Sequence, residues 1–85
     1  MDTRKPTSNE IVRSLMALGF RVTGVRKRQT VLENGRSRVS VPLRLGSKRR
    51  ELQLKKQLET YFYQASDLTN NLHVEKVKQW LFPSG

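Results

Sequence analysis

The chain has 85 residues, of which 17 are Lys or Arg and 7 are Asp or Glu, so its formal net charge is +10. This length predicts a single domain, and the absence of cysteine excludes a disulfide framework and a thiolate metal site. No apolar run approaches the roughly 18 residues of a membrane span, and the first ten residues lack the apolar core of a signal peptide. We therefore expect a small, soluble, cytoplasmic protein whose partner is a polyanion.

The excess charge is concentrated in the middle of the chain. Between Arg21 and Lys56 there are twelve basic and two acidic residues, so this segment alone carries +10 and the two flanks together sum to zero. Arg outnumbers Lys eight to four in this segment, and guanidinium groups suit bidentate contacts with phosphate. The concentration favours a nucleic-acid-binding face over a generally solvated basic surface, and it also fits an acidic protein partner.

The first predicted element is a helix over about residues 9–18. Thr7 and Glu10 have the spacing of a capping box, in which each side chain binds the other residue's backbone N–H. Apolar residues recur at i, i+4 and i+7 from Ile11. Gly19 follows, and it can take the left-handed conformation that ends a helix.

Three short segments of alternating polarity follow, and they predict a three-stranded antiparallel meander over roughly residues 20–25, 28–33 and 37–42. Phe20 and Val22 form the half-buried face of the first strand. Gly24 marks an expected bulge or bend, and Pro42 ends the third strand or places it at a sheet edge.

The hairpin between the second and third strands has two candidate registers. Asn34-Gly35 is the strongest short hairpin signal in the sequence, because both residues accept a positive φ. A two-residue turn pairs Val31 with Arg38, whereas a three-residue turn pairs Val31 with Val39. We favour the second register, because it keeps apolar residues on one face.

Two further helices complete an α+β fold. Ser47 can cap the second helix, whose basic first turns precede a broad apolar face that extends from Leu54 to Ala65. Asn70 or Asn71 can cap the third, whose apolar residues either pack on the chain's own core or dock a protein partner or a second copy: these are Val74, Val77, Trp80 and Leu81. The expected organisation is a flexible N-terminus (1–6), an α-β-β-β-α core (7–66) and a C-terminal helical extension (67–85).

The sequence offers little conventional catalytic chemistry. With one His, no Cys and scattered acids, we expect no metal and no other cofactor. His73 is interpreted as a surface or boundary residue, and the isolated glycines form no phosphate loop. Most aromatic residues fall on apolar faces, and Tyr63 is the ring best placed to be exposed.

Basic clusters occur at the turn between the first two strands, along the third strand, and at the start of the second helix. The alternative is that they point in different directions as ordinary solvated charge. We expect them to converge on one side of the sheet and second helix, so that residues such as Arg28, Arg38 and Arg49 share a face and contact the phosphate backbone of RNA or DNA. The candidate nucleic-acid-binding residues are Arg26, Lys27, Arg28, Gln29, Arg36, Arg38, Arg44, Lys48, Arg49, Arg50 and Lys55.

Residues 8–62 resemble the HicA toxin family. The similarity lies in the segment NEIVRSLMALGFRV with Gly19-Phe20, the segment GRSRVSVP with Val41-Pro42, and a second helix containing KKQL. The resemblance implies a double-stranded-RNA-binding-domain-like fold and a small ribonuclease that cleaves mRNA. It also implies a catalytic His on the second strand, where this chain has Gln29, and glutamine cannot exchange a proton near neutral pH. We therefore expect a non-catalytic binding protein, with a HicA-like toxin as the alternative and a basic module for an acidic protein partner as a third interpretation.

Overall fold

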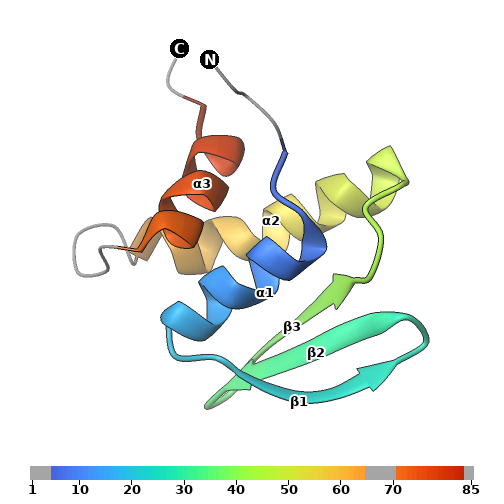
Figure 1. The fold of residues 1–85 in the computed structure, drawn as a ribbon. Coiled ribbons are helices and arrows are strands. Elements are labelled where there is room, and N and C mark those ends of the chain that lie inside the picture. The colour runs from blue at the N-terminus through green and yellow to red at the C-terminus, as the bar shows by residue number, and fades with distance from the viewer. Residues whose placement is uncertain (1–4, 65–70, 84–85) are drawn as a thin grey trace.

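Three helices and a three-stranded sheet make up the part of the chain that the computed structural model describes, residues 5–64 and 71–83. The strands form one antiparallel sheet in the order β1-β2-β3, and the helices lie together on one side of it (Figure 1). α1 and α2 contact β3, and α3 packs on α1 and α2. The predicted α+β class is therefore confirmed. The elements are α1 (Ser8–Ala17), β1 (Arg21–Arg26), β2 (Gln29–Asn34), β3 (Ser37–Pro42), α2 (Lys48–Gln64) and α3 (Leu72–Leu81).

α1 begins and ends at its sequence signals. The Thr7 side chain accepts a hydrogen bond from the Glu10 N–H at 3.1 Å, and the Glu10 side chain accepts one from the Thr7 N–H at 2.9 Å, so the capping box is complete. Gly19 follows the helix with a φ of +101°. The Phe20 N–H then reaches the Leu15 carbonyl oxygen at 3.0 Å, as in a Schellman motif. The helix limits lie within one residue of the prediction.

Glu10 also joins the first helix to the last. Its second carboxylate oxygen, Oε2, accepts a hydrogen bond from the Lys76 ammonium of α3 at 2.8 Å. This bond, followed by the backbone hydrogen bond from Thr7, lowers the pKa of Glu10 from 4.5 to about 2. Asn71 caps α3, because its Oδ1 accepts from the backbone N–H of His73 at 2.9 Å. One carboxylate therefore caps α1 and holds α3 against it.

The register of the second hairpin differs from both predicted alternatives. Val31 pairs with Ser40 and Leu32 pairs with Val39, so the turn consists of Gly35 and Arg36. The predicted pairing of Val31 with Val39 is wrong, because Leu32 rather than Val31 is the residue that faces the helices beside Val39. Gly35 has a φ of +60° and Arg36 does not have a positive φ, which is the pattern of a type II′ turn.

β1 is an edge strand, and the core covers little of it. The pairing with β2 shifts between Val22 and Gly24, so the predicted irregularity is confirmed and Thr23 is the extra residue of a β-bulge. Val22 is 45% exposed and Val25 is 63% exposed. The expectation that Val22 lies on a half-buried face is wrong, because β1 is an edge strand and, among the described elements, α2 contacts β3 but not β1.

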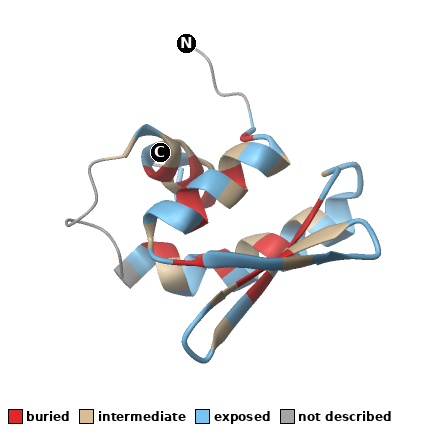
Figure 2. Cartoon of the chain, turned by 60° about the horizontal axis from the view of Figure 1, so that its bottom comes forward, coloured by how far each residue is buried: buried red, intermediate tan, exposed pale blue. Residues whose placement is uncertain are grey.

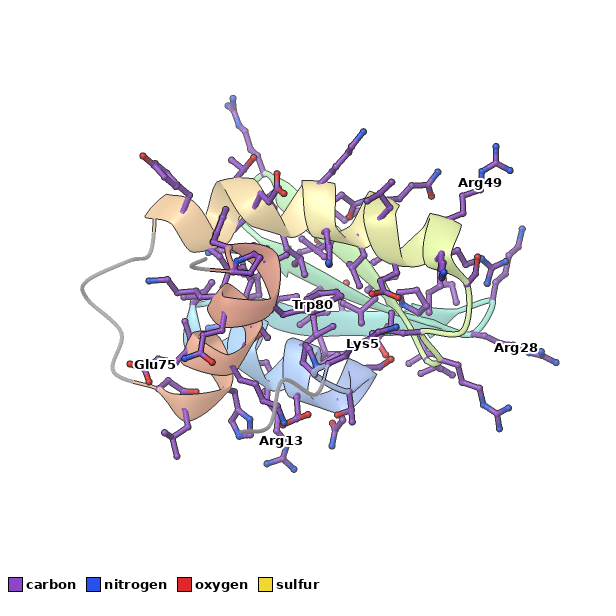
Figure 3. The ribbon with its side chains drawn as sticks, turned by 90° about the horizontal axis from the view of Figure 1, so that it is seen from above. Lys5, Arg13, Arg28, Arg49, Glu75 and Trp80 are labelled. Carbon is purple, nitrogen blue, oxygen red and sulfur yellow. The ribbon has the colours of Figure 1, made fainter. Side chains whose placement is uncertain are left out.

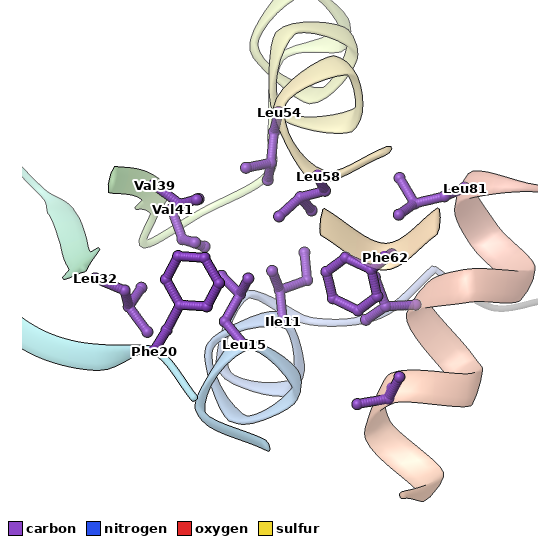
Figure 4. Close-up of a cluster of buried hydrophobic side chains, with 12 residues drawn as sticks. Ile11, Leu15, Phe20, Leu32, Val39, Val41, Leu54, Leu58, Phe62 and Leu81 are labelled. Carbon is purple, nitrogen blue, oxygen red and sulfur yellow. The ribbon is translucent and has the colours of Figure 1, made fainter. Parts of the chain in front are cut away.

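The core lies between the helices and the inner face of β2 and β3. Figure 4 shows the side chains that meet there, and Figure 2 shows that the buried segments gather at this boundary while the hairpin tips are exposed. The apolar face of α3 is buried within the chain, with Val74 and Val77 at 1% and 0% exposure. Packing on the chain's own core is therefore the observed role of this face, and a partner or homodimer through α3 stays a prediction. The core residues are Ile11, Leu15, Phe20, Leu32, Val39, Val41, Leu54, Leu58, Phe62, Val74, Val77 and Leu81.

The segment before α1 also packs on the domain. Pro6 is buried, and the Lys5 ammonium lies 3.1 Å from a carboxylate oxygen of Glu51 in α2. Residues 5 and 6, which the sequence assigns to a flexible N-terminus, thus contact the domain, and the first four residues of that segment lie outside the described residues. Ala65, predicted as the last member of the apolar face of α2, lies outside the described residues.

Candidate nucleic-acid interface

The turn between β1 and β2 is built from two cationic residues in an unusual backbone conformation. Arg26 pairs with Gln29, so Lys27 and Arg28 are its central residues, with φ values of +47° and +64°. Two consecutive positive φ values define a type I′ turn, which is normally formed by Asn-Gly or similar pairs. A residue with a Cβ atom in this region costs about 1–2 kcal/mol. The chain therefore places two exposed cations where a less strained sequence was available.

A backbone hydrogen bond brings this turn against the segment that leaves the sheet. The Leu43 N–H donates to the Arg28 carbonyl oxygen at 2.9 Å, one step beyond the Gln29–Pro42 pair of the β2–β3 ladder. Arg44 follows directly, so its position relative to Arg28 is set by the ladder. Two arginines separated by sixteen positions in the sequence are thereby held at the same end of the sheet.

The first turn of α2 supplies the third part of this region. The Ser47 carbonyl oxygen accepts a hydrogen bond from the Glu51 N–H at 3.0 Å, so Ser47 occupies the expected cap position. Lys48, Arg49 and Arg50 follow, and all three side chains are exposed. The carboxylate of Glu51 binds Lys5. Because Lys48, Arg49 and Arg50 form the first turn of α2, they lie at the positive end of the helix macrodipole. This position disfavours each of these cations by some tenths of a kcal/mol.

These three segments surround a cleft of about 520 Å³, which we call the arginine cleft. Its lining consists of three arginines from three different segments, together with two apolar residues, and it includes no acid. The lining residues are Arg28, Pro42, Leu43, Arg44 and Arg50. Arg28 and Arg49 extend from the same end of the molecule, away from Arg13 and Glu75 (Figure 3).

We call this region the basic end. Its cations come from the β1–β2 turn, from Arg44 in the segment that follows β3, and from the start of α2. Within the part of the chain that the structure describes, none of these cations forms an ion pair. The basic end comprises Arg26, Lys27, Arg28, Arg44, Lys48, Arg49 and Arg50.

The remaining candidate residues lie elsewhere or are engaged. Arg36 belongs to the β2–β3 turn, at the opposite end of the sheet (Figure 1). Arg38 lies 3.2 Å from the Glu33 carboxylate, four residues and about 13 Å along β3 from the cleft. The Lys55 ammonium lies 4.8 Å from the centre of the Trp80 ring. The expectation that Arg28, Arg38 and Arg49 share one face is therefore wrong for Arg38. This residue lies next to the β2–β3 turn, whereas the β1–β2 turn and the start of α2 lie at the other end of the sheet.

Gln29 occupies the position at which the family resemblance places a catalytic His. It is half-buried at the start of β2, between Arg26 and Pro42 in the sheet. His73 lies in the first turn of α3, and Figure 1 shows this helix on the side of the molecule away from the start of α2. The described residues contain no group of His, Asp or Glu side chains that could hold a metal ion.

Sequence patterns identified the cations of the basic end but not the apolar part of the cleft. The sequence predicts that Pro42 ends the third strand or places it at a sheet edge, and it predicts no role for Leu43, although both directly precede Arg44. Their position depends on the Arg28–Leu43 hydrogen bond, which follows from a register that differs from both alternatives predicted from the sequence. None of the described helices is long and apolar enough to cross a bilayer.

The chain was also compared with known proteins. No protein-family model, curated protein or solved structure matches it.

Proposed function

We propose that this protein is a non-catalytic nucleic-acid-binding domain that contacts the phosphate backbone of an RNA or DNA duplex through the basic end. One observation carries the proposal. Two basic segments that are distant in sequence, Lys27-Arg28 and Lys48–Arg50, meet around a cleft that no acid lines. A surface that needed charge only for solubility would mix both signs.

Two local free-energy costs support the proposal that these cations bind a ligand. The Lys27-Arg28 turn adopts positive φ values without glycine or asparagine, and strain of this kind persists mainly where function requires it. Lys48, Arg49 and Arg50 oppose the macrodipole of α2. A bound phosphate relieves the second cost, because it is attracted both to the cations and to the positive end of the helix.

The distribution of aromatic residues favours contact with a phosphate backbone over stacking on a single strand. Tyr63 is 74% exposed and stacks edge-on with Phe82 at 6.3 Å between ring centres. It lies thirteen residues after Arg50, or about 20 Å along α2. No aromatic ring lines the arginine cleft, whereas single-strand binding domains combine basic grooves with exposed rings. The resemblance to double-stranded-RNA-binding domains points in the same direction.

The test is a binding titration by fluorescence anisotropy against double-stranded and single-stranded RNA and DNA over a range of salt concentrations. Binding through four to six phosphates should give a slope of log affinity on log salt of about −4 to −5 for duplex DNA. We expect the duplexes to bind more tightly than the single strands. A flat slope would overturn the proposal. Gel analysis of the same RNA samples should show binding without cleavage, and cleavage by clean preparations would instead favour the HicA-like enzyme.

A pair of matched variants locates the interface. Arg50→Gln and Arg13→Gln each remove one exposed arginine from a helix, but only Arg50 lines the cleft. We expect Arg50→Gln to weaken binding about fivefold to tenfold for every sequence and to reduce the magnitude of the salt slope by about 1. Arg13→Gln should change the affinity less than about twofold, because screening limits distant charges. Equal effects would show that net charge, not the basic end, determines binding.

A further inference from the structure

Three cations of the basic end, Arg28, Arg44 and Arg50, line the arginine cleft together. We propose that this cleft binds the terminal phosphate of a nucleic-acid strand and holds the terminal nucleotide against Leu43. This inference rests on the proposed function and adds to it the recognition of a strand end.

The charge of the cleft matches a terminal phosphate better than an internal one. Arg28, Arg44 and Arg50 contribute three positive charges and no acid offsets them within the lining. An internal phosphodiester carries one negative charge and two non-bridging oxygens, whereas a phosphate monoester carries about −1.5 to −2 near pH 7 and three such oxygens. Each guanidinium can donate two parallel hydrogen bonds. Three arginines are therefore matched more closely by a monoester than by a diester, both in charge and in the number of non-bridging oxygens.

The apolar part of the cleft fits the rest of a terminal nucleotide. Leu43 is 51% exposed and lines the cleft together with three arginines, and Pro42 beside it is buried. The cleft volume of about 520 Å³ falls within the range of roughly 300–1,000 Å³ that is typical of small-molecule sites. Phosphate contacts alone would not use an exposed leucine, whereas the sugar or base of a terminal nucleotide can cover it.

The cleft is also partly preorganised. The Leu43–Arg28 hydrogen bond fixes the apolar wall against the β1–β2 turn, and the positive φ values of Lys27 and Arg28 fix the direction in which the turn points. Rigid placement lowers the entropy cost of binding. Only Arg50 comes from a different layer, the start of α2.

The test compares blunt duplexes of about 16 base pairs that differ only at their ends: a 5′-phosphate, a 3′-phosphate or hydroxyl groups alone. We expect at least one phosphorylated duplex to bind about fivefold or more tightly than the hydroxyl form. The two phosphorylated forms show which terminus the cleft accepts. Equal affinity for all three forms, together with a steep salt slope, would overturn this inference and leave the proposed function standing. Failure of every duplex to bind would overturn both.

Two variants connect the end preference with the cleft. Arg44→Gln removes one of the three guanidinium groups, so it should weaken binding to all three duplexes. The phosphorylated and hydroxyl duplexes should then bind with about equal affinity. Arg36→Gln removes an exposed arginine at the opposite turn and should keep the full preference. If the preference persists in Arg44→Gln, the cleft is not its source. Circular dichroism on both variants establishes that the fold is retained.

Discussion

Glu10 uses both carboxylate oxygens for structure: one caps α1 and the other binds Lys76 of α3. These hydrogen bonds need the ionised form, and they lower the pKa of Glu10 in the folded state to about 2, against 4.5 for the unperturbed group. The folded state therefore binds a proton less readily than the unfolded chain. The stabilisation is fully present above pH 4.5 and is lost as the pH falls towards 2.

We predict that Glu10→Gln lowers the free energy of unfolding by about 1 kcal/mol near pH 7, the scale of a partly exposed ion pair with a capping contribution. The measurement is urea denaturation of both proteins between neutral pH and pH 2. The difference between them should shrink through the window from 4.5 to about 2, because the wild type also becomes protonated there. A difference that stays constant with pH would show that the charge of Glu10 does not provide the stabilisation.

Single residues also show why composition alone overstates how many cations of the basic segment are available to a ligand. Arg38 and Lys55 belong to the same basic segment as Arg50, and the sequence gives no reason to separate them. In the structure, Arg38 pairs with Glu33 across β2 and β3, and Lys55 lies over Trp80. Both partners come from other elements, so only the fold shows that these two cations have partners.

At the scale of elements, the helix limits that depend on neighbouring residues could be predicted from the sequence. The capping box of Thr7 and Glu10 and the glycine after α1 fixed that helix to within one residue. The register of the β2–β3 hairpin was not predictable, because Val31 and Leu32 are adjacent and either one can face the core. The choice depends on contacts with α1 and α2, which the local sequence does not contain. The walls of the arginine cleft follow from that same register.

The β1–β2 turn allows stability and binding to be separated. We predict that the double substitution Lys27→Asn, Arg28→Gly raises the melting temperature by about 4–8 °C, because Asn-Gly adopts the type I′ turn with less strain and one kcal/mol corresponds to about this shift. The same variant should bind duplexes about tenfold more weakly, since it removes two cations of the proposed interface. Thermal denaturation and anisotropy are the measurements.

The control for the turn is Lys27→Gln, Arg28→Gln, which removes the same charges without relieving the backbone. It should lose affinity to a similar extent and show no gain in melting temperature. If Asn-Gly does not stabilise the domain, the positive φ values of this turn carry no strain. If it stabilises the domain and retains full affinity, the turn lies outside the interface.

At the scale of the molecule, the fold separates the basic end from the packed face of α3. The basic end combines the β1–β2 turn with the start of α2, whereas the opposite side carries α3, whose apolar face completes the core. The net charge of +10 therefore does not describe a uniform field. The sheet also places Arg36 and the Arg38–Glu33 pair at its other end, where the pair is neutral overall and adds nothing to the charge of the basic end.

This division predicts where a bound duplex alters the amide spectrum of the protein. Titration followed by ¹H–¹⁵N correlation spectra should shift the amides of residues 26–28 and 43–50 most strongly, because these segments line or flank the arginine cleft. The amides of residues 72–81 should shift little, since α3 packs on α1 and α2. A separate titration with a poly-glutamate peptide serves as the comparison. If the peptide produces the same shifts at equal concentration, the basic end is a general site for acidic partners instead of a phosphate site. If the largest shifts gather on residues 35–38 or on α3, the interface lies elsewhere and the two basic segments meet for a structural reason alone.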